Sequence, residues 1–120
     1  MDEYVVLIVG DADRWWTTMD VHKRKAGYAE YSRFAEELAK RGHKVIGGAE
    51  LHATSEGLRI PRGGGAVTEG PFAEVTEQVG GFYQVETDDL GDLMECCQII
   101  AAVGDGIEVR RVVAPEDRPS

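Results

Sequence analysis

The chain has 120 residues, enough for one domain built around a single hydrophobic core. Its residues are 42% hydrophobic and 29% charged, which is ordinary for a soluble globular protein, and no apolar run reaches the ~18 residues that a membrane span needs. The formal net charge of −9 argues against nucleic-acid binding, because binding to phosphates needs clustered Lys and Arg side chains, and these are scattered here. We therefore expect one domain over residues 1–120, with no nucleic-acid or membrane partner.

An apolar run near the N-terminus predicts a buried strand. Residues 4–9, YVVLIV, are rich in β-branched side chains and are followed by Gly10 and Asp11. The residues before this run are acidic where a secretory signal is basic, and the run is too short for the central region of such a signal. The sequence therefore favours an intracellular, cytoplasmic protein.

A long amphipathic helix is predicted for residues 18–41. Its apolar positions recur every three or four residues, and they are Tyr28, Tyr31, Phe34, Ala35 and Leu38. Gly42 marks the end of the helix. Because glycine costs about 1 kcal/mol relative to alanine inside a helix, we expect an irregular start or a break near Gly27.

Five further segments have the polarity pattern and the bounding turn residues of β-strands. They are residues 43–53, 57–61, 65–70, 81–87 and 106–113. The pair Gly47-Gly48 predicts a bulge in the first of them, and the second and third predict a hairpin. We expect residues 114–120 to be a frayed tail.

The second predicted helix is capped by Asp88 or Asp89, runs to about Val103 and contains both cysteines. Its predicted buried stripe consists of Leu90, Leu93, Met94, Cys97, Ile100 and Ala101. Cys96 falls on a different face, so we expect two free thiols, of which Cys96 is the more readily alkylated. The cysteines do not have the spacing of a zinc site, and the sequence predicts no metal.

The order of these elements predicts the fold class. It is β-α-β, an extra hairpin, then β-α-β, which fits the α+β split βαβ or ferredoxin-like arrangement. Helices then cover only one face of the sheet, and a domain of this size commonly covers the other face with a second copy of itself. We expect a homodimer.

The segment over residues 67–93 carries a specific motif. It reads VTEGPFAEVTEQVGGFYQVETDDLGDL, and GIEVRRVV follows at residues 106–113. These segments resemble the DGPF domain, a branch of the YCII-related proteins, and the segments GDADRWW, YSRF and GAEL also sit where that family has comparable ones. The resemblance implies a dimeric α/β barrel with a cleft in each subunit near the motif.

Several positions depart from the family pattern. Glu69 stands where the family has Asp, Thr76 where it has Lys and Arg111 where it has Pro. The YCII-type branch is also associated with a His-Asp pair, and the first-helix position that aligns with its His is Tyr31. Most DGPF proteins have no established reaction, so the resemblance leaves open whether the cleft is catalytic.

The motif loop supplies the first candidate site residues. Glu69 is a candidate acid-base group and Glu77 a candidate substrate-binding group, because carboxylates held close together shift one another's pKa towards neutrality. The alternative is a solvated loop in which Gly70-Pro71 sets a turn and both glutamates face water. We expect Phe72 to lie at the site as a core side chain that anchors this loop.

The segment over residues 10–16 supplies the second group of candidates. Arg14 can bind a ligand carboxylate, and Trp15 or Trp16 can stack on a ring. The alternative is a surface loop with one Trp buried against a dimer partner. Asp11 and Asp13 are expected to be turn or cap residues.

Three other residues are candidates by their chemistry. His52 is an acid-base candidate because histidine side chains as a type change charge near neutral pH, although a histidine without a visible partner is more often a partly exposed strand residue. Arg110 on the last strand is a second candidate anion clamp, with an ion pair to Glu108 or to a partner subunit as the alternative. Tyr31 is a candidate positioning donor.

Two functions from different classes follow from these residues. The first is a small, cofactor-independent, enzyme-like protein that binds a small anionic or aromatic metabolite near the motif and transfers a proton. The second is a non-catalytic dimeric module that binds a ligand or a protein. Neither identifies a substrate or a pathway.

Overall fold

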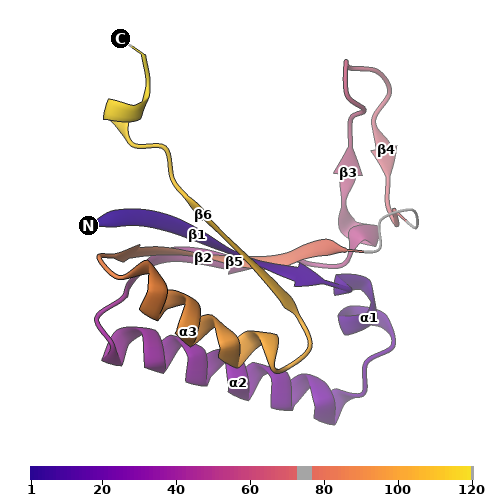
Figure 1. Cartoon of the computed structure of the whole chain (residues 1–120). Coiled ribbons are helices and arrows are strands. Elements are labelled where there is room, and N and C mark those ends of the chain that lie inside the picture. The colour runs from indigo at the N-terminus through magenta and orange to yellow at the C-terminus, as the bar shows by residue number, and fades with distance from the viewer. Residues whose placement is uncertain (73–76, 120) are drawn as a thin grey trace.

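The protein is a four-stranded antiparallel sheet with its helices on one face (Figure 1). The computed structural model describes residues 1–72 and 77–119. The strands are β1 (Asp2–Gly10), β2 (Lys44–Glu50), β5 (Gln78–Thr87) and β6 (Gly106–Arg111). Their order across the sheet is β2-β5-β1-β6, so the first strand lies in the interior between β5 and β6. This order confirms the predicted α+β, ferredoxin-like fold.

Two long helices pack on the sheet, and each begins at an aspartate. Helix α2 (Val21–Lys40) is capped by Asp20, and helix α3 (Leu90–Ala101) by Asp89, whose carboxylates accept backbone N–H bonds of 2.8 and 3.0 Å. Helix α2 runs unbroken through Gly27, contrary to the expected break. Within the described residues, no helix has the length and hydropathy needed to cross a membrane.

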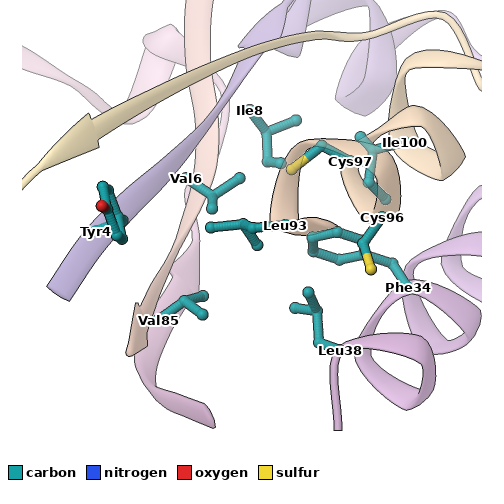
Figure 2. Packing of buried hydrophobic residues seen from close by; sticks show 10 residues of the cluster. All are labelled: Tyr4, Val6, Ile8, Phe34, Leu38, Val85, Leu93, Cys96, Cys97 and Ile100. Atoms are coloured by element: carbon teal, nitrogen blue, oxygen red, sulfur yellow. The ribbon is translucent and has the colours of Figure 1, made fainter. Parts of the chain in front are cut away.

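The hydrophobic core lies between the sheet and the two helices (Figure 2). Its buried members are Tyr4, Val6, Ile8, Phe34, Leu38, Val85, Leu93, Cys96, Cys97 and Ile100. On β1, the buried residues alternate with half-buried ones, as expected for a strand with one face in the core.

The predicted buried stripe of α3 is partly wrong. Leu90 and Met94 are exposed, whereas Cys96 is fully buried beside Cys97. The reason is that α3 packs against both the sheet and α2, so two adjacent flanks of the helix are covered. Burial raises the pKa of both thiols, that of Cys97 to about 11, and neither cysteine is the readily alkylated one that we expected.

A short hairpin follows a single turn of 3₁₀ helix, η1 (Thr54–Glu56). Its strands, β3 (Leu58–Arg59) and β4 (Thr68–Glu69), are shorter than predicted, and the hairpin rises on the side of the sheet opposite α2 and α3 (Figure 1). Gly70 packs so closely against the carbonyl of Thr54 that a side chain there would collide with it. The EGPF segment is therefore held tightly against η1.

Phe72 is not the core residue that we expected. It is half-buried at the base of the hairpin, where its ring lies against Gly57 and under the guanidinium of Arg59, 3.8 Å from the ring centre. The region after Phe72, including Thr76, lies outside the described residues.

The C-terminal segment also differs from the expectation of a frayed tail. Residues 115–117 form a 3₁₀ turn, η2 (Pro115–Asp117), and Asp117 pairs with Arg111 at 2.8 Å. Like the hairpin, this segment projects away from the helical layer (Figure 1).

The different burial of two phenylalanines gives a test of the fold. Phe34→Ala removes a fully buried ring and should cost about 3–5 kcal/mol in the free energy of unfolding. Phe72→Ala removes a half-buried ring and should cost about 1–2 kcal/mol. Urea unfolding of both variants measures the two losses, and equal losses would contradict the placement of Phe72 outside the core.

Candidate functional site

A cavity of about 310 Å³ opens where the ends of β1, β2 and β5 meet the middle of helix α2. A further short helix, α1 (Ala12–Thr17), forms its wall, in the segment that we expected to be a loop. The cavity is lined by the aromatic residues Trp15, Trp16, Tyr28, Tyr31, Phe82 and Tyr83 and by the acidic residues Asp11, Glu50 and Asp105. It combines aromatic surface with carboxylates.

Trp15 is held in the cavity wall by its contact with Gly27. A Cβ at Gly27 would lie 2.7 Å from the indole ring, so only glycine lets α1 approach α2 this closely. The indole also makes edge-on contacts with Tyr28 and Tyr31, at ring-centre distances of 5.1 and 6.5 Å. The glycine that weakens α2 locally is therefore required by this packing.

Tyr31 and Asp105 form the most buried polar pair of the cavity. The tyrosine hydroxyl donates a hydrogen bond of 2.7 Å to the carboxylate of Asp105, which follows α3 in the turn before β6. Burial and this bond raise the pKa of Tyr31 far above its usual range, so the phenol stays protonated. The carboxylate lies against Gly10, where a Cβ would come within 2.6 Å of its oxygen.

A second tyrosine and carboxylate lie one helical turn earlier. The Tyr28 hydroxyl donates to Glu50 at 3.0 Å, and burial and this bond raise the pKa of Tyr28. The buried indole nitrogen of Trp15 has no hydrogen-bond partner among the described residues. Tyr28 and Tyr31 are three residues apart on α2, so both hydroxyls reach the same cavity.

Trp16 and His52 form the outer edge of the site. Their rings stack at 4.4 Å, and the Trp16 indole donates to the carbonyl of Leu51 at 3.2 Å. His52 is exposed, and its Nδ1 accepts a bond from the backbone N–H of Ala53 at 2.9 Å. His52 does not itself line the cavity but supports a residue that does.

Asp13 connects the cavity wall to the loop before the hairpin. Its carboxylate accepts two bonds of 2.6 Å from the backbone and side chain of Thr54, and a third of 3.3 Å from Gln78. These bonds, those from Thr54 above all, lower the pKa of Asp13. Asp11 is the N-cap of α1, as expected, with a bond of 2.9 Å from the N–H of Arg14.

The structure brings only some of the predicted site residues together. Trp15 and Tyr31 line the cavity, whereas Glu69 on β4 and Glu77 before β5 are exposed and lie outside its lining. Arg14 and Arg110 do not line the cavity either. Arg110 is paired across from Val5 in the sheet, and strand alternation turns it to the face opposite the helices.

The charge of the lining differs from that of a site for anions. Among the described residues that line the cavity there are three carboxylates and no Arg or Lys. Arg24 lies beside the lining: its guanidinium is 5.8 Å from the centre of the Trp16 ring and bonds to the carbonyls of Trp15 and Met19.

A family model described as the YCII-related domain matches residues 3–115. The chain belongs to the YCII-related family. This membership agrees with the ferredoxin-like fold, and the match includes every residue of the cavity lining. No curated protein matches the sequence.

Sequence reasoning missed Asp105 and Glu50 in this YCII-related protein. Asp105 lies 74 residues from Tyr31 and reads as an ordinary turn residue, and Glu50 lies at the end of a strand. The one sequence feature that pointed to this polar site was the spacing of Tyr28 and Tyr31, which places two hydroxyl groups on the apolar stripe of a predicted helix.

The bonds to Asp13 give a prediction about pH. Because the pKa of Asp13 is lowered on folding, its stabilising effect is present above its unfolded pKa of ~3.9 and is lost as the pH falls through the folded value. Asp13→Asn should therefore lower the free energy of unfolding by about 1–2 kcal/mol at pH 7, and the difference from wild type should shrink below pH ~4.

Urea unfolding from pH 3 to pH 7 measures this difference, with the exposed Asp2→Asn as the control variant. A loss that is equally large at pH 3 and pH 7 would contradict an ionised Asp13 bonded to Thr54.

Proposed function

We propose that this YCII-related protein is a small, cofactor-independent, enzyme-like protein that binds a small metabolite in the aromatic cavity and exchanges a proton with it at Asp105. The observation that carries the proposal is the Tyr31–Asp105 pair, 2.7 Å apart, inside a cavity whose described lining has six aromatic residues. It replaces Glu69 as the proposed acid-base group, since Glu69 is exposed on the hairpin.

The two members of the pair have different roles in the proposal. Tyr31 remains a neutral donor because its pKa is raised, so it holds the carboxylate and does not take up a proton itself. Asp105 has a second carboxylate oxygen, which can accept a proton from a ligand. A general base needs this combination of fixed geometry and free lone pairs.

The size and lining of the cavity favour one kind of ligand. A volume of about 310 Å³ is at the lower end of the roughly 300–1,000 Å³ of ligand pockets, which suits a molecule with one ring. Aromatic walls favour an aromatic ligand. Since the described lining carries three carboxylates and no Arg or Lys, it supports an aromatic metabolite better than an anionic one.

The motif over residues 67–72 supports placing the protein in the DGPF branch of the family. In this chain the described part of the motif packs on η1, and Gly70 and Phe72 both contact Thr54. Thr54 is also the residue that binds Asp13 of the cavity wall. We propose that the motif supports the site through Thr54 and Asp13 without itself contacting the ligand.

We also propose that the protein is a cytoplasmic homodimer that associates through the open face of its sheet. Val5 and Leu7 lie on that face, and their neighbours across to β6 are Arg110 and Glu108. The hairpin and the C-terminal segment both project on this side (Figure 1). An apolar centre with charges of both signs beside it is self-complementary, as an interface between two identical faces must be.

A non-catalytic dimeric module remains the second candidate function. The hairpin carries three exposed apolar residues, Leu58, Ile60 and Val67, with exposed fractions of 71%, 62% and 57%. Such a surface is typical of a protein-binding segment. In this case the cavity would bind a ligand without exchanging protons.

Proton exchange at Asp105 can be tested without knowledge of the natural reaction. A thermal-shift screen with small phenols, aromatic amines and aromatic carboxylates should yield a ligand that raises Tm. NMR of that ligand in D₂O should then show replacement of an acidic C–H by deuterium with wild type, at a rate lowered by about 10²-fold or more in Asp105→Asn.

The matched controls are Tyr31→Phe, which keeps the ring and removes the bond to Asp105, and Tyr4→Phe, which changes a tyrosine of the core outside the cavity. Tyr31→Phe should slow the exchange and Tyr4→Phe should not. Ligand binding with no wild-type exchange would favour the non-catalytic module, and the absence of any cavity ligand would contradict the proposed enzyme-like function.

The dimer is tested by light scattering at micromolar concentration. Wild type should have the mass of two chains, because an interface over the open face buries more than about 1,000 Å². Leu7→Glu should give a monomer, since it places a charge in the centre of that face. Leu90→Glu, at an exposed position of the helical layer, should leave the dimer intact. A wild-type monomer would refute the proposed interface.

A further inference from the structure

Three metal-ligating side chains meet at the end of the sheet opposite the cavity. They are His43, Asp92 and Cys96, and their ligand atoms all lie within 4.8 Å of one another. His43 and Cys96 are buried, with exposed fractions of 2% and 0%, while the side chain of Asp92 is 25% exposed. We call these three residues the α3 triad.

The local structure explains why these residues meet. Asp92 and Cys96 are four residues apart on α3, so they lie on one face of the helix, one turn apart. His43 lies in the connection between α2 and β2, where its backbone N–H bonds to the carbonyl of Leu38 at 2.9 Å. Helix α3 thus supplies two of the donors, and the connection before β2 supplies the third.

The histidine is oriented as it is in metal sites. Its Nε2 faces the carboxylate of Asp92 at 2.6 Å, and its Nδ1 lies 2.7 Å from the hydroxyl of Thr87. The N–H of Asp89 bonds to the same hydroxyl at 3.0 Å, which fixes Thr87 in place. Metal-ligating histidines almost always have such a partner on the other ring nitrogen, because it fixes the ring and the tautomer.

The charges and atom types of the triad suit Zn²⁺. Zinc is bound in proteins by the nitrogen, sulfur and oxygen donors that imidazole, thiolate and carboxylate supply. On binding, the Cys96 thiol releases its proton to solvent, and the imidazole carries its proton on Nδ1, facing Thr87. The negative charges of the thiolate and of Asp92 then balance the two positive charges of the ion.

One adjustment is needed for the ion to enter. In a tetrahedral site with bonds of about 2.0–2.1 Å, the nitrogen and oxygen ligands lie roughly 3.3 Å apart, further than the 2.6 Å between His43 and Asp92. Asp92 is the most exposed member and can move outward, and its other oxygen is already bound by Arg41. The carboxylate keeps that partner as it moves.

We propose that His43, Asp92 and Cys96 form a binding site for Zn²⁺, with a fourth position left for water on the exposed side of Asp92. The expectation of no metal rested on the spacing of Cys96 and Cys97, and it did not consider ligands from two separate parts of the sequence. The site is independent of the cavity and of the function proposed for it.

Titration of the tag-free, reduced and metal-free chain with Zn²⁺ in a calorimeter tests the proposal. We expect one ion per chain. Cys96→Ser and Asp92→Asn should weaken binding by more than the roughly 10- to 100-fold that is typical of losing a supporting partner. Cys97→Ser is the matched control, because Cys97 is equally buried but is not part of the triad, and its affinity should equal that of wild type.

Co²⁺ gives a second measurement that depends on no variant and so on no variant's folding. With wild type, the proposal predicts a thiolate-to-cobalt charge-transfer band and the intense visible bands of tetrahedral Co²⁺. Absence of stoichiometric Zn²⁺ binding, absence of the thiolate band, or a Cys96→Ser affinity equal to that of Cys97→Ser would each overturn the proposed site.

Discussion

The contact between the Trp15 indole and the backbone of Gly27 determines where the candidate site lies. It brings α1 against α2 and leaves room for two tyrosines beside the indole, all facing the ends of the sheet strands. A larger residue at Gly27 would push the indole away and change the shape of the cavity. The cost of glycine within α2 is a local loss of helix stability, of about 1 kcal/mol.

Helix α2 connects two polar regions that have different chemistry. Near its middle, Tyr31 donates to Asp105 in an aromatic cavity. Just beyond its C-terminus, His43 joins Asp92 and Cys96 in a small buried cluster. Between them lies the core residue pair Phe34 and Leu38, which keeps water and charge out of the space that separates the two regions. One amphipathic helix therefore organises both sites and the core.

The sequence was sufficient for the fold because its signals are local. Alternating burial on β1 and the apolar spacing of α2 follow from neighbouring residues, and the order of elements then leaves few topologies. The sites depend on long-range contacts. Asp105 reaches Tyr31 across 74 residues and His43 reaches Asp92 across 49, and neither distance leaves a pattern in the sequence.

The EGPF motif shows how a specific sequence signal can be assigned to the wrong physical cause. We expected Glu69 of this motif, with Glu77, to reach the site, because carboxylates held close together shift one another's pKa. In the structure, Gly70 is needed for the close approach to Thr54, and Glu69 is exposed. Phe72 packs locally against Gly57, which explains why an aromatic residue there does not belong to the core.

The chain has two tryptophans, and both line the cavity, so their side-chain signals report on this region alone. The most direct measurement of the central claim is a two-dimensional ¹H–¹⁵N NMR spectrum recorded with increasing amounts of a small aromatic probe. The account predicts that the two indole N–H signals shift together and saturate, while backbone amides of the hairpin and of η2 stay in place. Saturable binding that moves hairpin amides and leaves both indole signals unchanged would contradict it.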